Sequence, residues 1–223
     1  KLTAEAELKA LRAQVNPHFL FNALTTIGYL IESAPPRAMN TLMQLTALLR
    51  GVLRSEGDFT TLGREIELVE HYLKIEHERF EERLRVRIEV PQALRHLQIP
   101  ALVVQPLVEN AIKHGVAPST TGGEVEVTAR TEGTGGAECL RVSVRNTGAP
   151  LRPGSPREAN EQVGVENVRR RLSGHYGEAA TLTLATAPGR GTIAELLIPL
   201  VDVARMDKDD HDAHPVAGRV GRR

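Results

Sequence analysis

One histidine stands within an apolar run, NPHFLFNAL from Asn16 to Leu24, and is the first candidate for chemistry. On a helical wheel at 100° per residue, the sector of His18 also holds Leu11, Val15 and Asn22, and Phe19 and Phe21 flank it. The pattern predicts a buried apolar seam that contains one titratable group. A core histidine bonded to a backbone carbonyl is the competing interpretation.

A second stretch, IPALVVQPLVENAIKHGV from Ile99 to Val116, places four polar side chains near the end of a helical apolar pattern: Glu109, Asn110, Lys113 and His114. Asn110, Lys113 and His114 share one helix face. An amide oxygen is a suitable ligand for Mg²⁺, which prefers few protein ligands together with water and phosphate oxygens. Lys113 or His114 could approach a phosphate. The alternative is a solvated polar face on a half-buried helix.

Three helices are predicted to position the first histidine, with breaks at Ala34-Pro35-Pro36 and at Gly57-Asp58. The first runs from near Thr3 to Ile31. The second carries Leu42, Leu45, Leu49 and Val52, and the third carries Leu62, Ile66, Val69, Leu73 and Phe80. Two long helices present more apolar surface than a hairpin can cover, which favours a four-helix bundle with a second copy.

Pro17 is expected inside the first helix. A proline there removes a backbone hydrogen bond and predicts a bend beside His18.

After residue 84 the pattern changes to alternation between glycine-rich turns. Strands are expected over residues 85–90, 124–131, 140–144, 182–187 and 192–199, and helices over residues 101–115 and 164–175. Two strands follow the last helix consecutively, which is typical of an α/β sandwich rather than a doubly wound sheet. The predicted fold class is therefore α+β, with a helical region before the sandwich.

Composition narrows the range of partners. Acidic and basic residues number 28 each, which gives no electrostatic reason to expect a nucleic acid. Cys139 is the single cysteine, so no internal disulfide can form. The chain has neither a signal peptide nor an apolar run of about eighteen residues. These absences favour a cytosolic chain, and because it opens at Lys1 without methionine and already in a helical pattern, we expect a fragment whose upstream part could be anchored in a membrane.

The two polar stretches together resemble the LytS-type sensor histidine kinases, in which PHFLFN precedes a nucleotide-binding domain with LVENAIKHG. The resemblance spans about residues 8 to 199, with further matches in LLRGVL, EIELVEHYLKIEHERF, GVENVRRRL and GRGTIAELLIP. It implies a dimer, and an ATP-binding domain of the Bergerat (GHKL) type shared with gyrase and chaperone ATPases.

The resemblance implies phosphoryl transfer from ATP to an imidazole nitrogen of His18, with Mg²⁺ bridging the phosphates. Neutral imidazole is the nucleophile, and Asn22, one turn later, could fix its tautomer. Phe19 stands where other histidine kinases carry an acidic residue, so Glu109 is the candidate general base. The phosphoramidate would pass its phosphoryl group to an aspartate in the receiver domain of a response regulator.

For the nucleotide, the resemblance points to two further turns. Asn146-Thr147-Gly148 stands where the family carries Asp-Asn-Gly, so Asn146 accepts from adenine without the charge-assisted component. Gly191 and Thr192 are implied beside adenine. A plain strand-end turn and a plain hairpin are the alternatives at these two places.

Where the family has Gly-x-Gly, only Gly164 remains. It is expected to precede a helix start that favours phosphate, with Asn167 in the first turn.

The chain is thus divided into a helical dimerisation and phosphoacceptor region (residues 1–83), an ATP-binding domain (residues 84–200) and a tail (residues 201–223) expected to be disordered. Two other functions stay open. A degenerate kinase core could act as a dimeric interaction module, a hypothesis that Asn146 and the thinned glycine motif motivate. An ATPase of the gyrase or chaperone class would share the fold but would not explain PHFLFN.

Overall fold

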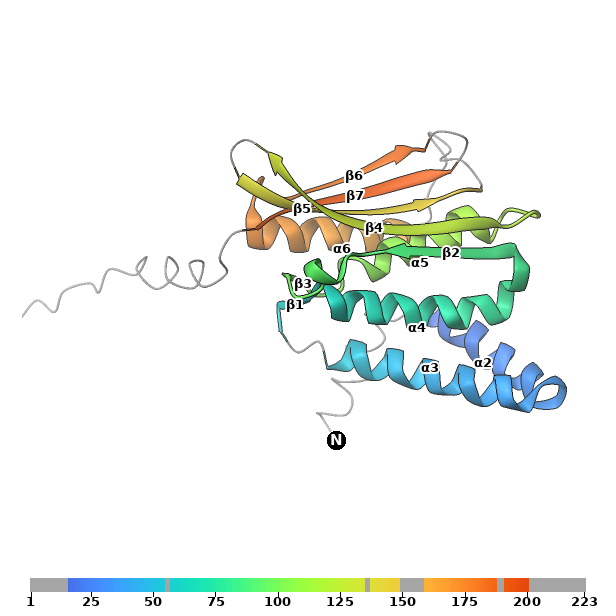
Figure 1. The fold of residues 1–223 in the computed structure, drawn as a ribbon. Coiled ribbons are helices and arrows are strands. Elements are labelled where there is room, and N and C mark those ends of the chain that lie inside the picture. Colours follow the sequence, from blue (N-terminus) through green and yellow to red (C-terminus); the bar gives the residue numbers. More distant parts are fainter. Residues whose placement is uncertain (1–15, 55–56, 135–136, 149–158, 188–190, 201–223) are drawn as a thin grey trace, which may run out of the picture.

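In a computed structural model of the chain, the described residues are 16–54, 57–134, 137–148, 159–187 and 191–200. The helical region consists of α2 (Pro17–Ser33), α3 (Pro35–Leu53) and α4 (Leu62–Phe80). Figure 1 shows α2 and α3 on the side of α4 that faces away from the sheet. The expected tail, residues 201–223, and the part of the first predicted helix before residue 16 lie outside the described residues.

The remaining elements form a mixed sheet with helices on one face (Figure 1). Its strands are β2 (Leu84–Glu89), β4 (Gly123–Thr134), β5 (Ala137–Asn146), β7 (Thr192–Pro199) and β6 (Thr181–Thr186), in that spatial order. Only the β2–β4 pairing is parallel among these strands. The covering helices are α5 (Gln105–Ala111), its continuation η3 (Ile112–Val116) and α6 (Ala159–Tyr176). The predicted α+β class, with two consecutive strands after the last helix, is confirmed.

Short elements connect the two regions. β1 (Phe59–Thr61) pairs with β3 (Gln98–Pro100) in a two-stranded antiparallel sheet that the sequence did not predict. Two single turns of 3₁₀ helix, η1 (Glu81–Arg83) and η2 (Gln92–Leu94), flank β2. None of the helices in the described part of the chain combines the length and apolar character needed to cross a bilayer.

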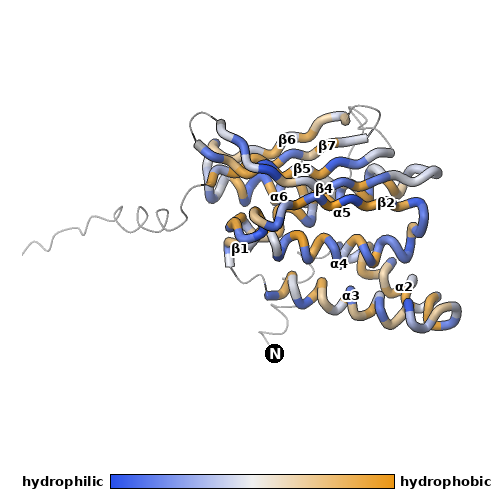
Figure 2. The backbone as a smooth tube through the Cα atoms, in the orientation of Figure 1, coloured by the Kyte–Doolittle hydropathy of each residue, from blue (hydrophilic) through white to orange (hydrophobic). Residues whose placement is uncertain are grey.

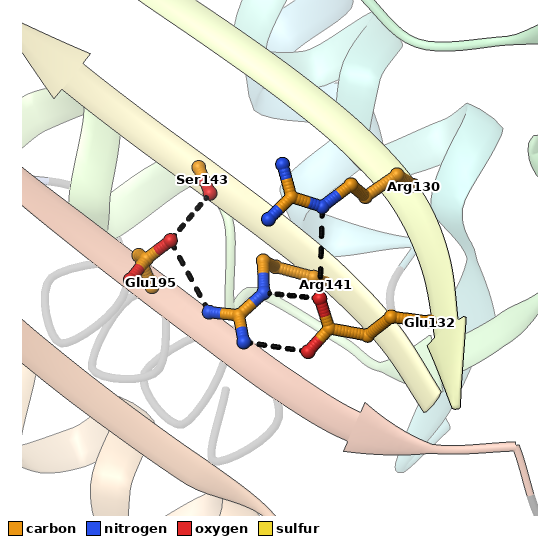
Figure 3. Close-up of polar contacts among 5 residues, drawn as sticks. All are labelled: Arg130, Glu132, Arg141, Ser143 and Glu195. Atoms are coloured by element: carbon orange, nitrogen blue, oxygen red, sulfur yellow. Dashed lines mark hydrogen bonds and ion pairs between the residues drawn. The ribbon is translucent and has the colours of Figure 1, made fainter. Parts of the chain in front are cut away.

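The strands have one apolar and one polar face, as alternation requires. Buried residues of β4, β5 and β7, such as Val127, Val142 and Leu196, contact the helices, and Figure 2 shows this alternation along the tube. On the outer face, Arg141 bonds Glu132 through Nε and Nη2 at 2.8 and 2.5 Å, and its Nη1 lies 3.2 Å from Glu195 (Figure 3). These ion pairs cross three strands and leave that face solvated.

Two predictions about the first helix are wrong. Pro17 is the first helical residue rather than an interior one, and the Asn16 side chain caps the helix by accepting from the His18 N–H at 3.0 Å. A proline fits this position because its missing N–H would have no helical partner. The bend expected beside His18 is therefore a helix start.

The buried residues of the helices follow from how they pack. α2 buries Phe19, Ala23, Ile27 and Leu30. In α3 the expected Leu45 and Val52 are buried, whereas Leu42 is exposed and Leu48 takes its place in the core. All five residues predicted for the buried face of α4 are buried: Leu62, Ile66, Val69, Leu73 and Phe80.

Candidate active site

A pocket of about 150 Å³ lies where α2, α4 and the α5–η3 helix meet. It brings together residues from segments that are far apart in the sequence. The sequence-predicted residues that line it are His18, Asn22, Glu109, Asn110, Lys113, His114 and Gly164. The structure thus joins both polar stretches in one concave surface.

His18 is exposed in the first turn of α2, so the predicted buried histidine seam is wrong. Phe19 takes the inward position instead, and its ring centroid lies 4.8 Å from that of Tyr72 on α4. The expected contact with Asn22 is present: its Nδ2 lies 3.3 Å from His18 Nδ1. Because Nδ1 is engaged, Nε2 is the ring nitrogen left to react.

Glu109 lines the same pocket beside Asn110. Its carboxylate accepts from Gln105 Nε2 at 2.9 Å. Burial, opposed by the Gln105 hydrogen bond and helped by the nearby Glu76 carboxylate, raises the pKa of Glu109 to about 7. A carboxyl group with such a pKa can exchange a proton near neutral pH.

The helix that carries Asn110, Lys113 and His114 widens at η3 into a π-helical turn, where Ala117 N–H donates to Ile112 O at 2.9 Å. Such widened turns occur often at functional sites. All three side chains line the pocket, in agreement with the shared face expected from the sequence.

The start of α5 is anchored to α4 by a buried carboxylate. Glu65 accepts the backbone N–H groups of Leu102, Val103 and Val104 at 2.7, 3.1 and 2.9 Å. These donors belong to the turn before α5, whose first N–H groups have no helical acceptor. The position of Asn110 relative to the helical region therefore depends on Glu65.

A second cluster lies at the ends of β5 and β7. Asn146 pairs with Thr192, both are buried, and the Asn146 side chain packs against Gly115 of η3. Gly148 and Gly191 have φ values of 137° and 112°, which favour glycine, and a Cβ on either would overlap neighbouring backbone. Nδ2 of Asn146 has no hydrogen-bond partner among the described residues. A buried amide donor of this kind is suited to a ligand.

The two remaining predicted residues lie elsewhere than expected. α6 begins at Ala159, so Gly164 lies inside this helix rather than before its start, and Asn167 is not in the first turn. Gly164 still lines the pocket, whereas Asn167 is exposed and does not.

Sequence reasoning missed three residues of α4 that line the pocket: Tyr72, Glu76 and Arg79. Glu65, Val69, Tyr72 and Glu76 follow one another at spacings of four, three and four residues, which is the periodicity of a buried face. The sequence did contain an indication of this part of the site, because Glu65 and Glu76 occupy positions of that buried face where apolar residues are typical.

The described residues include no group of three or more His, Cys, Asp or Glu side chains that could hold a metal ion. One amide oxygen, from Asn110, suits Mg²⁺ because that ion takes most of its ligands from phosphate and water. At about 150 Å³ the pocket fits phosphoryl groups rather than a whole nucleotide, which needs roughly 300 Å³ or more.

Comparisons with known proteins agree with this arrangement. The family described as "Histidine kinase" matches residues 6–84, and that described as "Histidine kinase-, DNA gyrase B-, and HSP90-like ATPase" matches residues 95–202. The histidine kinase domain of a blue-light activated histidine kinase from Erythrobacter litoralis has the same fold, with a TM-score of 0.51 at 17% identity over 93% of this chain and 95% of that domain.

Three sensor proteins are similar in sequence. Sensor histidine kinase BtsS of Escherichia coli K12 is 37% identical over 91% of this chain, and sensor histidine kinase YesM of Bacillus subtilis is 33% identical over 87%. Sensor protein LytS of Staphylococcus haemolyticus is 36% identical over 82%. The chain spans 35%, 33% and 32% of these three relatives, about a third of each. It therefore belongs to the LytS-type sensor histidine kinases, with a region that matches the histidine kinase family before a region that matches the GHKL ATPases.

Proposed function

We propose that this chain transfers the terminal phosphoryl group of ATP to His18 and then to an aspartate in the receiver domain of a response regulator. The observation that carries the proposal is the single pocket lined by His18, Asn22, Glu109, Asn110 and Lys113. An interaction module without catalysis would not need the histidine and the polar end of α5 in one pocket. The same observation disfavours the gyrase or chaperone class, because such an ATPase needs no histidine there.

In this reaction, the lone pair of His18 Nε2 attacks the terminal phosphorus, and the bond to the bridging oxygen breaks as ADP leaves. Asn22 orients the ring by donating from Nδ2 to Nδ1, which places the proton of the neutral imidazole on Nε2. The Glu109 carboxylate takes the proton from Nε2, and this frees the lone pair that forms the bond to phosphorus. Its pKa of about 7 suits that role at neutral pH.

For the nucleotide, Asn110, Lys113 and His114 are proposed to bind the phosphates, with Gly164 in α6 closing one side of the pocket. Asn110 is the protein ligand to Mg²⁺, which when bound neutralises charge on the phosphates.

The base is assigned to the second cluster. There Asn146 accepts from the adenine amino group through Oδ1 and donates from its unpartnered Nδ2 to a ring nitrogen, Gly148 and Gly191 allow close approach, and Thr192 lies at the edge. Asn167 belongs to the GVENVRRRL stretch that resembles the family, but it is exposed and does not line the pocket, so no contact with the nucleotide is assigned to it.

A homodimer is proposed through α2 and α3. Their outer faces expose large apolar side chains, including Phe21 and Tyr29, whose exposed fractions are 70% and 74%, and Met43 at 63%. Such apolar surface marks an interaction site, and a second copy offers a matching face. The resulting bundle would have four helices.

Two further assignments belong to the whole protein. We place this chain in the cytoplasmic portion of a membrane-associated bacterial sensor protein, as the relatives named sensor proteins suggest. The division into residues 1–83, residues 84–200 and a tail is retained, and the two family matches at residues 6–84 and 95–202 support it.

The test is incubation of the chain with γ-labelled ATP and Mg²⁺, beside His18→Gln and Asn110→Asp variants. We expect acid-labile, base-stable label on the unaltered chain and none on either variant. ATP binding without label would contradict transfer to His18. No label together with no measurable ATP binding would support the interaction module.

A further inference from the structure

A third wall of the pocket comes from α4, which the assignments above leave without a role. Tyr72, Glu76 and Arg79 lie at spacings of four and three residues and therefore share one face of the helix. All three line the pocket with His18. The contact between the Tyr72 and Phe19 rings holds this face of α4 against the turn that carries His18.

The guanidinium of Arg79 is held in place at this wall. Its Nη1 lies 3.3 Å from Glu76 Oε2, and its central carbon lies 4.6 Å from the centroid of the Phe80 ring. The Glu76 side chain is only 4% exposed, whereas that of Arg79 is 35% exposed. A buried carboxylate thus fixes one end of a guanidinium that has five N–H donors and remains accessible.

The charges around the pocket favour a cation at this wall. Glu76 and Glu109 both line it, and either carboxylate would repel an incoming phosphoryl group. Lys113 is on the nucleotide side, in η3, whereas Arg79 is on the helix that packs against α2. A planar guanidinium can bind two phosphoryl oxygens at once.

We propose that Arg79 binds the phosphoryl group as it passes to His18 Nε2, and that Glu76 is the positioning residue that holds the guanidinium. This inference rests on the proposed function. Arg79 keeps its proton throughout: the nitrogen–phosphorus bond forms, the bond to ADP breaks, and the imidazole proton goes to Glu109. The guanidinium stabilises the charge on the oxygens of the moving group.

The first experiment compares Arg79→Gln and Arg79→Lys with an Arg83→Gln control in ATP-dependent labelling. Arg83 also lies over the Phe80 ring, at 5.7 Å, but it donates to Ser119 O at 2.7 Å and does not line the pocket. We expect Arg79→Gln to lower the labelling rate about 100-fold, with ATP affinity changed less than about threefold. Arg79→Lys should be intermediate, and Arg83→Gln should label like the unaltered chain.

The second experiment tests Arg79 in a phosphorylation reaction that does not use ATP. Phosphoramidate transfers its phosphoryl group to imidazole and releases ammonia, so it can phosphorylate His18 directly. We expect Arg79→Gln to slow this reaction about tenfold and to shift the ³¹P signal of phosphorylated His18, with His18→Gln as the blank. If the unaltered chain reacts with phosphoramidate but not with ATP, the proposed kinase function fails while this experiment still decides the role of Arg79.

A purely structural ion pair would give different results. The double variant Glu76→Gln/Arg79→Gln removes both charges, so it avoids leaving a buried carboxylate unpaired. If it regains both thermal stability and labelling, Arg79 serves the fold alone and the proposal is overturned. Equal rates for Arg79→Gln and the unaltered chain in both reactions would overturn it as well.

The single variant Glu76→Gln tests the positioning role. The glutamine still offers an oxygen that accepts from Arg79, but the negative charge that holds the guanidinium is lost. We expect a lower kcat with an unchanged KM for ATP, because the guanidinium is held less firmly against the moving phosphoryl group while the nucleotide contacts are untouched. A loss of stability alone would move neither quantity in this way, and unchanged kcat would contradict the role of Glu76.

Discussion

Replacing Glu65 by glutamine tests whether one buried carboxylate sets the position of α5 against α4. In the native chain, one oxygen accepts the Leu102 N–H and the other accepts those of Val103 and Val104. Glutamine has a single carbonyl oxygen, which can still accept the N–H groups of Val103 and Val104. Its NH₂ group then faces the Leu102 N–H, where a donor meets a donor.

The expected loss follows from these bonds. One buried N–H without an acceptor costs about 1–3 kcal/mol, and the two remaining bonds lose their charge assistance, which is roughly half their strength. Burial raises the pKa of Glu65 while the backbone N–H groups lower it, so removing the charge offsets part of the loss. We expect the free energy of unfolding to fall by about 2–4 kcal/mol.

Urea-induced unfolding followed by circular dichroism measures this loss, provided that the dependence on denaturant stays the same for each variant. Glu67→Gln is the matched control, because Glu67 is exposed on the same helix. It should change stability by less than about 0.5 kcal/mol. A Glu65→Gln variant as stable as the control would refute the anchoring role of these hydrogen bonds.

Three further changes test other parts of the molecule. Gly115→Ala would place a Cβ against the Asn146 amide, so nucleotide affinity in a fluorescence titration should fall about tenfold or more, whereas Gly174→Ala, with open space around it, should bind normally. Glu109 has a folded pKa of about 7 against an ordinary value of 4.5, so its contribution to stability is complete below pH 4.5 and is lost as the pH rises to about 7. Glu109→Gln should remove that fall in urea unfolding curves measured across this range. Phe21→Ser should weaken the dimer at least tenfold in sedimentation equilibrium, and an unchanged dimer would show that this face of α2 is not the interface.

The sheet and the helix α4 were predictable because their periodicities are strong. Val125, Val127 and Ala129 alternate with charged or polar residues, and every second side chain of a strand points to one face. The pairing of β1 with β3 was not predictable, since three-residue strands such as Phe59–Thr61 carry too little pattern. Their pairing depends on contacts between segments separated by about forty residues.

The orientation of His18 depended on where the helix begins, which apolar periodicity alone does not determine. The predicted seam of Leu11, Val15 and His18 assumed one helix through Pro17, and its first two residues lie outside the described part of the chain. Once Asn16 caps the helix, the packing of α2 against α4 is decided by Phe19, whose ring meets Tyr72. His18, 100° away on the wheel, then lies at the pocket rather than in the core.

The acidic residues of α4 show why the rest of the site needed the structure. Glu65 and Glu76 occupy the same buried face, and from the sequence alone each breaks the apolar pattern in the same way. Their partners separate them: Glu65 meets three backbone N–H groups of the turn before α5, whereas Glu76 meets a guanidinium that opens into the pocket. Because both carboxylates project from one helix, α4 fixes the start of α5 through Glu65 and holds Arg79 at the pocket that His18 also lines.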